Sequence, residues 1–172
     1  MMKHIAALTL FLASLAAALS AGLTGAAGAQ NASEIAAVQA GRSCPGCNLF
    51  QADLAYRDLP GVDVSNARLR QADLSLATMN RARFDGADLS IANLFGARFT
   101  GASFRRADLT RANLVGAHFG GADLTGAVLD GAMLAGAEMQ EARGLTAAQL
   151  SRACGDASTR LPAGLSTPPC AR

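Results

Sequence analysis

Residues 87–126, ADLSIANLFGARFTGASFRRADLTRANLVGAHFGGADLTG, decide the fold. A large apolar residue stands at every fifth position of this stretch, and an alanine stands two positions before each one. Helices repeat apolar residues about every 3.6 positions and half-buried strands about every 2, so neither produces this spacing. A period of five fits a coil with several short sides, in which each side places one small and one large side chain in the interior.

The same register extends in both directions from this stretch. It holds at 19 consecutive positions from Leu49 to Met139, without an insertion. The preceding alanine occurs 16 times in succession, from Ala67 to Ala142. Glycine follows many of the sides, where the chain must bend sharply and glycine tolerates the tight backbone. These corner glycines are Gly86, Gly96, Gly101, Gly116, Gly121, Gly126, Gly131 and Gly136.

The runs ADLS at 87–90 and ADLT at 107–110 and 122–125 resemble the motif of the pentapeptide-repeat family. The resemblance covers residues 47–143. It implies an all-β fold, a right-handed quadrilateral pentapeptide-repeat β-helix (a solenoid) with four pentapeptides in each coil. Residues 20 apart are then expected to stack, with Phe84 beneath Phe104 and Phe99 beneath Phe119 in the core.

One residue of the first coil breaks the pattern. Arg57 stands at a position where a small inward residue belongs, and a buried unpaired guanidinium is costly. We expect local distortion there, with Arg57 reaching solvent or pairing with a carboxylate such as Asp58.

Both flanks of the repeats are predicted to be short capping helices, because a stack of coils exposes apolar ends and unpaired edges. The N-terminal cap segment is residues 30–46, with a helix that starts after Asn31 and stops at Gly41. The C-terminal segment is residues 144–172. It begins with a capping box from Thr146, its helix is expected to end near Gly155, and an irregular disulfide-closed tail follows.

Residues 1–29 are typical of a cleavable signal peptide. Lys3 precedes an apolar run over 5–19, and Ala27-Gly28-Ala29 predicts a cut before Gln30. The run is shorter than the ~20 residues of a membrane span, so we expect no stable membrane insertion after cleavage. No cysteine stands at the cut after a Leu-Ala-Gly type box, which disfavours a lipid anchor. The sequence therefore predicts an exported protein, periplasmic or extracellular.

The four cysteines of an exported chain are expected to form disulfides. We pair Cys44 with Cys47, at inward positions of the first partial coil, and Cys154 with Cys170, which bracket the tail. Cys-x-x-Cys also occurs in thiol-redox proteins, but there it lies between a strand and a helix of a βαβ unit. A four-cysteine zinc site needs both pairs together, whereas these pairs belong to opposite ends. No metal and no cofactor are expected.

The charge balance narrows the classes of partner. Without residues 1–29 the chain has 14 Arg, no Lys and 13 acidic residues, for a net charge near +1. This balance argues against nucleic-acid binding. The resemblance raises a topoisomerase-binding mimic of DNA as an alternative, because some family members have that role. Those members are strongly acidic and cytoplasmic, so charge and export both disfavour it here.

Residues for catalysis are scarce, and we predict that the protein is not an enzyme. His118 is the one histidine after residue 29, and no Ser-His-Asp set can be assembled around it. The sequence instead predicts an exported scaffold that binds a protein or a surface of the cell envelope, as a monomer or a homodimer.

Two exterior regions are candidate interaction surfaces. The first is basic and is partly neutralised by Asp85; it consists of Arg81, Arg83, Arg105 and Arg106. The second is an apolar stack of Phe95, Val115 and Ala135 with Met133 beside it. We expect the C-terminal tail to cover the apolar stack, with self-association through it as the alternative.

Overall fold

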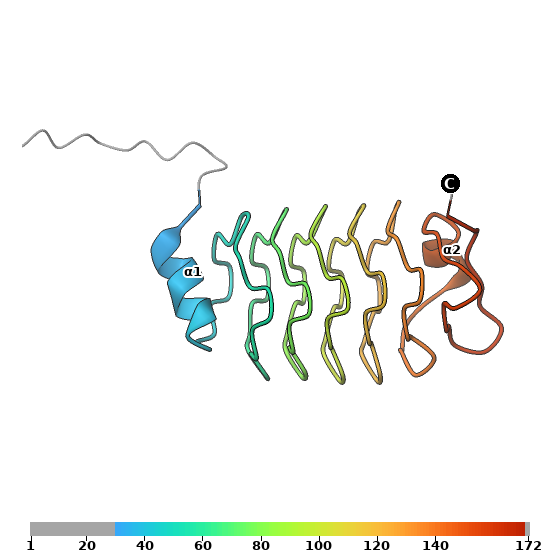
Figure 1. Ribbon diagram of the computed structural model, residues 1–172, viewed down its shortest axis with the longest axis horizontal. Coiled ribbons are helices and arrows are strands. Elements are labelled where there is room, and N and C mark those ends of the chain that lie inside the picture. The colour runs from blue at the N-terminus through green and yellow to red at the C-terminus, as the bar shows by residue number, and fades with distance from the viewer. Residues whose placement is uncertain (1–29, 171–172) are drawn as a thin grey trace, which may run out of the picture.

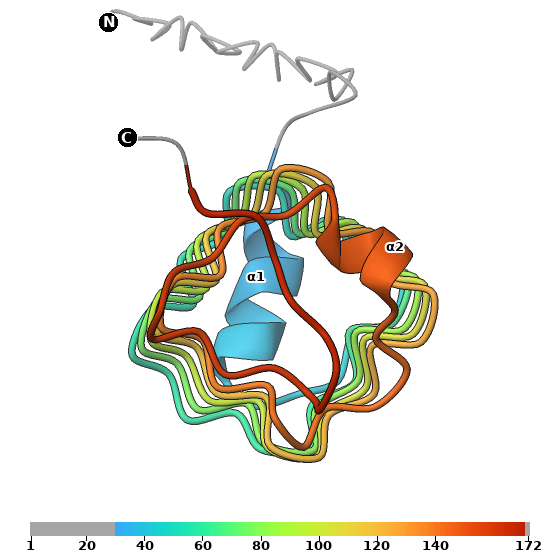
Figure 2. The same cartoon turned by 90° about the vertical axis from the view of Figure 1, so that its right-hand side faces the viewer.

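The computed structural model describes residues 30–170, which wind into a stack of similar coils (Figure 1). Seen along its axis, the stack has a four-sided outline (Figure 2). Helix α1, Ala32–Gln39, lies at the N-terminal end, and helix α2, Ala147–Leu150, lies near the C-terminal end. The predicted signal peptide, residues 1–29, lies outside the described residues.

Single parallel bridges hold the coils together. Sixteen bridges join residues 20 apart, in steps of five from Asn48↔Arg68 to Asp123↔Arg143. Longer strands do not occur between residues 30 and 170, because each side is only five residues long and turns at both ends. The predicted stacking at 20 residues is confirmed.

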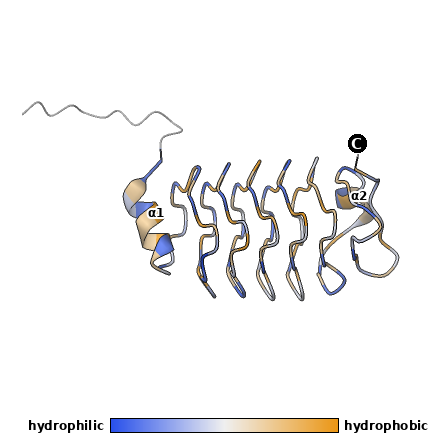
Figure 3. Ribbon diagram, viewed as in Figure 1, coloured by the Kyte–Doolittle hydropathy of each residue, from blue (hydrophilic) through white to orange (hydrophobic). Residues whose placement is uncertain are grey.

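The bridging residues define four sides, which we number by their first residue. Side 1 begins with Asn48, side 2 with Asp53, side 3 with Asp58 and side 4 with Asp63. On each side, residues 20 apart in sequence stack in a column, one from every coil. Hydrophilic and hydrophobic residues consequently alternate along every turn of the chain (Figure 3).

The interior is built from the predicted register. All 19 large apolar residues from Leu49 to Met139 are buried, with at most 3% of their surface exposed. The rings of Phe84 and Phe104 stack with centroids 4.6 Å apart, and Phe99 and Phe119 stack at 5.3 Å. Each buried side chain of this kind stabilises the fold by about 1.5–3 kcal/mol before chain entropy is counted.

The corners are two-residue turns whose second residue has a positive φ. Glycine adopts this conformation without strain. Nine corners carry another residue, and even β-branched Ile91 has φ 60°. At Gly96 glycine is also required by contact, because a Cβ there would lie 2.7 Å from a methyl carbon of Leu76. Gly96 thereby lets the Leu76 side chain pack against the next coil.

Arg57 reaches solvent as predicted, but the predicted distortion around it is wrong. The bridge Asp58↔Thr78 is present, and the Thr78 amide donates to the Arg57 carbonyl at 2.8 Å. Residue 57 belongs to the first coil. Its side chain is exposed while its backbone keeps the ladder, so the guanidinium is not buried in the core.

Helix α1 lies across the N-terminal opening of the coils (Figure 2). Asn31 caps it by accepting from the Glu34 amide, and Val38 is buried against the core. The Glu34 carboxylate accepts from the Asn48 amide at 2.6 Å, and the Gln39 side chain donates to the Asp53 carbonyl at 2.8 Å. The helix thus provides partners for backbone groups of the first coil.

Helix α2 starts with the capping box of Thr146 and Gln149 and buries Leu150. The expected continuation to Gly155 is wrong, since the helix ends at Leu150 and Cys154 then pairs with Met133. Rejoining the ladder gives the Cys154 amide a partner, the Ala132 carbonyl at 3.0 Å. The segment after α2 therefore forms one further, less regular coil.

Candidate interaction surfaces

One corner of the solenoid exposes large apolar side chains. We call it the apolar corner and define it by the residues Tyr56, Leu76, Phe95 and Val115, which belong to the stacked turns between sides 2 and 3. Tyr56 is 76% exposed, Leu76 44% and Phe95 45%, while Val115 is half-buried. Four successive coils therefore present apolar surface along one edge.

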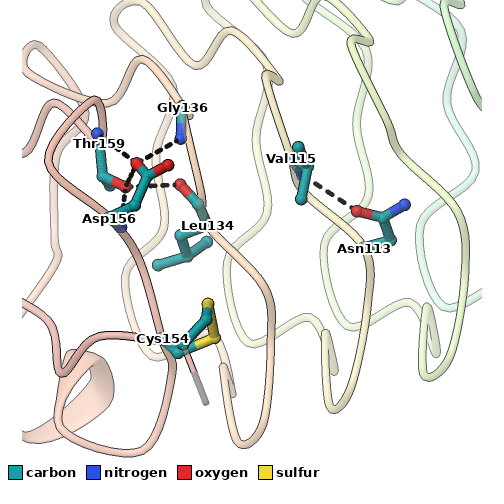
Figure 4. Close-up of a disulfide and its surroundings, with 8 residues drawn as sticks. Asn113, Val115, Leu134, Gly136, Cys154, Asp156 and Thr159 are labelled. Carbon is teal, nitrogen blue, oxygen red and sulfur yellow. Dashed lines mark hydrogen bonds between the residues drawn. A yellow bond between two sulfur atoms is a disulfide. The ribbon is translucent and has the colours of Figure 1, made fainter. Parts of the chain in front are cut away.

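Side chains of side 2 fix the turns of this corner. The Asn93 side-chain oxygen accepts from the Phe95 amide at 3.3 Å, and the Asn113 oxygen accepts from the Val115 amide at 3.2 Å (Figure 4). Nδ2 of the Asn113 side chain also donates to Oδ1 of Asn93 at 3.0 Å. This ladder between coils holds Phe95 and Val115 in a defined position.

The expected cover by the C-terminal tail is wrong. Phe95 and Met133 are 45% and 43% exposed in the presence of residues 156–170. The tail pairs with the end of the stack instead, through the bridge Gly155↔Pro169, and crosses the C-terminal opening (Figure 2). It is therefore absent from the side of the solenoid.

Tyr56 and Leu76 were not assigned to a surface by the sequence analysis. The signal was present, because the 20-residue register places residues 56 and 76 in one column, next to the turn of Phe95.

The basic side chains lie among carboxylates. Arg83 is 3.9 Å from Asp63 and 3.5 Å from Asp85, on side 4. Asp85 also accepts hydrogen bonds from the Ser103 hydroxyl and from the Arg105 amide. Exposed pairs of this kind contribute little to stability. They nevertheless leave side 4 with mixed charge.

Two carboxyl groups of side 4 have lowered pKa values. A hydrogen bond from the Ser65 hydroxyl is the main cause that lowers the pKa of Asp63, with a smaller effect of Arg83. The Thr125 hydroxyl chiefly lowers the pKa of Asp123. Both groups stay ionised at neutral pH, and their negative charge offsets the positive charge of nearby arginines.

The four predicted arginines lie on side 4 and on the two turns that flank it. Arg81 lies at the turn before side 4, whereas Arg105 and Arg106 lie at the turn after it, one coil further along. Arg83 lies between these two turns with its carboxylate partners. The arginines thus gather around one side, and their role as an interaction surface stays a prediction.

The cysteines form two disulfides, Cys44–Cys47 and Cys154–Cys170, and residues 30–170 contain no free cysteine. Cys44 and Cys47 pack against the hydrophobic core, and the Cys44 amide donates to the Asp63 carbonyl at 2.8 Å. Each bond lies at one end of the stack.

His118 lies on side 3, with Nδ1 3.1 Å from a Glu138 carboxylate oxygen. Within the described range, no group of three His, Cys, Asp or Glu side chains is arranged to hold a metal ion. No helix of that range is long and apolar enough to cross a membrane.

Comparison with known families identifies the repeats. The family model described as "Pentapeptide repeats" matches in 8 copies over residues 47–86, 72–111, 87–126 and 112–143, which together make up more than half of the chain. The chain belongs to the pentapeptide-repeat family. No curated protein matches it.

Solved structures of pentapeptide-repeat proteins resemble this chain. One, from the Arabidopsis thaliana thylakoid lumen, is 31% identical with a TM-score of 0.40, over 60% of this chain and 72% of its own. Rfr23 from the cyanobacterium Cyanothece 51142 is 28% identical with a TM-score of 0.42, over 75% and 97%. QnrB1, a plasmid-mediated fluoroquinolone resistance protein, matches in a trypsin-treated variant at 22% identity and a TM-score of 0.32, over 63% and 69%.

Proposed function

We propose that this protein is an exported, non-enzymatic scaffold of the cell envelope that binds a protein partner through the apolar corner. The observation that carries the proposal is the exposed row of Tyr56, Leu76 and Phe95 on a solenoid whose interior is fully packed. Exposed apolar rows of this kind are typical of interaction sites, and aromatic residues contribute strongly to binding.

Export is the second part of the proposal. It is supported by the signal-peptide pattern of residues 1–29 and by two disulfides, which persist in oxidising compartments. In this setting α1 and α2 act as end caps, and the disulfides secure the segments beside them. Sequencing the N-terminus of the protein recovered from cell fractions tests the export, with Gln30 as the expected first residue.

Two alternative functions have less support. A topoisomerase-binding mimic of DNA needs a strongly acidic surface, whereas side 4 combines arginines with carboxylates. A thiol-redox role for Cys44 and Cys47 needs an accessible thiolate. This disulfide instead packs against the core at the first coil.

Photo-crosslinking tests the apolar corner directly. A photoreactive amino acid is placed at Leu76 or Phe95, and in matched controls at Asp108 on side 1 or Arg98 on side 3. The proposal expects one adduct of defined mass from the first two positions and none from the controls. An adduct of twice the mass would identify a second copy as the partner. Equal labelling at all four positions would contradict the proposal.

A further inference from the structure

The C-terminal end contains a cavity separate from the apolar corner. Its volume is about 560 Å³, within the range of about 300–1,000 Å³ for small-molecule sites. Residues of the last coil form one wall, and tail residues 161–167 form the other. The disulfide Cys154–Cys170 and the bridge Gly155↔Pro169 hold the tail beside the last coil.

Several polar side chains of this cavity have no partner in the part of the chain that the structure describes. The guanidinium of Arg160, the amide of Gln140 and the hydroxyls of Ser166 and Thr167 make no hydrogen bond or ion pair among residues 30–170. The backbone of Arg160 is fixed by the bridge Glu138↔Arg160. A solvent-exposed cation on a fixed backbone and three further polar groups thus line one space.

The carboxylate of the cavity already has a structural role. Oδ1 of Asp156 accepts from the Gly136 amide at 3.1 Å (Figure 4). It also accepts from the amide and hydroxyl of Ser158 at 3.0 and 2.7 Å. These bonds, the Ser158 hydroxyl first, lower the pKa of Asp156 to about 2. Asp156 is therefore ionised at neutral pH, and its charge disfavours ligands with several negative charges.

The cavity also has an apolar part. Leu161 and Leu165 are half-buried, pack against the hydrophobic core and line the same space. A guanidinium binds a single carboxylate through two parallel hydrogen bonds, which is its strongest common pairing. We propose that this cavity binds a small aliphatic carboxylate, with the carboxylate on Arg160 and the aliphatic group on Leu161 and Leu165.

Nuclear magnetic resonance titration of the oxidised protein tests this site, with N-acetyl-L-leucine as the probe and its uncharged amide as the control ligand. We expect the acid to shift the amide signals of Arg160, Leu165 and Ser166. The amide control should bind at least about tenfold more weakly, because it lacks the charge. Equal binding of acid and amide, or shifts confined to other residues, would overturn the proposal.

Substitutions of Arg160 test whether its guanidinium binds the carboxylate of the ligand. Arg160→Gln should weaken binding of the acid at least about tenfold. The affinity of Arg160→Lys should lie between those of Arg160→Gln and the native protein, because lysine keeps the positive charge but cannot form two parallel hydrogen bonds to one carboxylate. Arg98→Gln, on the same side of the solenoid but remote from the tail, should leave binding unchanged. Unchanged binding in a folded Arg160→Gln protein would contradict the assignment.

The disulfide provides an independent check. Replacing both Cys154 and Cys170 by serine frees the tail wall but keeps Arg160 in the ladder. The acid should then bind less well, while the amide signals of coils 48–143 stay native. Undiminished binding in this variant would exclude the tail as part of the site.

Discussion

The coils up to residue 143 and the coil that follows them are stabilised differently. In the former, every bridge joins residues 20 apart, and each side buries an apolar residue from the five-residue register. In the latter, the spacing becomes 21 at Met133↔Cys154 and 22 at Glu138↔Arg160. Polar side chains such as Asp88 and Asp123 fix turns in the regular coils as well, so these bonds are common to both regions. The comparison teaches that the regular coils are distinguished by their continuous apolar interior, whereas the irregular coil adds a disulfide that joins its two ends.

The largest expected effect lies in the regular coils. Phe104 contacts the rings of Phe84, Phe99 and Phe119 and has no exposed surface. Phe104→Ala should lower the free energy of unfolding by about 3–5 kcal/mol through lost burial and the cavity left behind. Urea denaturation measures the change. The exposed Phe95→Ala is the matched control, and an equal loss in both variants would refute the assigned interior.

The next effect concerns the irregular coil. Cys154 and Cys170 are 16 residues apart in sequence, and closing a loop of that size contributes about 3 kcal/mol. Replacing both by serine should destabilise residues 154–170 by up to that amount. Replacing Cys44 and Cys47, only 3 apart, should cost less because the closed loop is shorter. Thermal unfolding of the two double variants measures both losses of stability. A larger loss in the Cys44 and Cys47 variant would contradict this prediction.

A glycine at the boundary separates the two regions. Gly144 has φ 75°, and a Cβ there would lie 2.6 Å from the backbone nitrogen of Thr125. Gly144→Ala should destabilise the protein by about 2 kcal/mol, because both the conformation and the space are unfavourable. Gly121 also has a positive φ, but a Cβ there would meet open space.

Gly121→Ala is therefore the control, with an expected loss of about 1 kcal/mol from the backbone conformation alone. Denaturant unfolding of both variants gives the comparison. If the two losses are equal, crowding at Gly144 has no effect.

The smallest expected effect is a pH dependence of the irregular coil. The pKa of Asp156 is about 2 in the folded protein against an ordinary value of 3.8, so its ionised form is the one that the fold stabilises. That stabilisation is complete above the ordinary pKa and is lost as the pH falls from about 4 to about 2. The native amide signals of Ser158 and Thr159 should weaken over this range.

Asp156→Asn is the control for this titration. Asparagine keeps an acceptor oxygen at the same place but does not ionise, so its signals should show no such transition. A transition of equal size in Asp156→Asn would assign the pH dependence to another group.

The sequence predicted the interior almost completely. Each inward residue repeats the same local requirement, so a pattern of five was enough to find it and the 20-residue stacking. Exterior corners were harder to predict, because Tyr56 and Leu76 occupy turn positions whose neighbours belong to other coils. Their common surface becomes visible only when the coils are aligned.

The ends were predicted less well for a different reason. Past residue 143 the period is lost, and nothing local fixes where the chain returns to the ladder. The end of α2 and the course of the tail depend on backbone partners far away in sequence, such as the Ala132 carbonyl for Cys154. The cavity beside Arg160 depends on the same long-range contacts, and the sequence gives no signal for it.

Residue-resolved hydrogen exchange tests most directly the claim that two kinds of interaction stabilise the two regions. It is measured on the native protein and on the variant with serine at Cys154 and Cys170. We predict that the variant loses protection at the amides of Gly155 and residue 170, which bond between the last coil and the tail, while the amides of Arg160 and of Leu69 to Leu124 keep theirs. An equal loss of protection along all the coils would contradict the account.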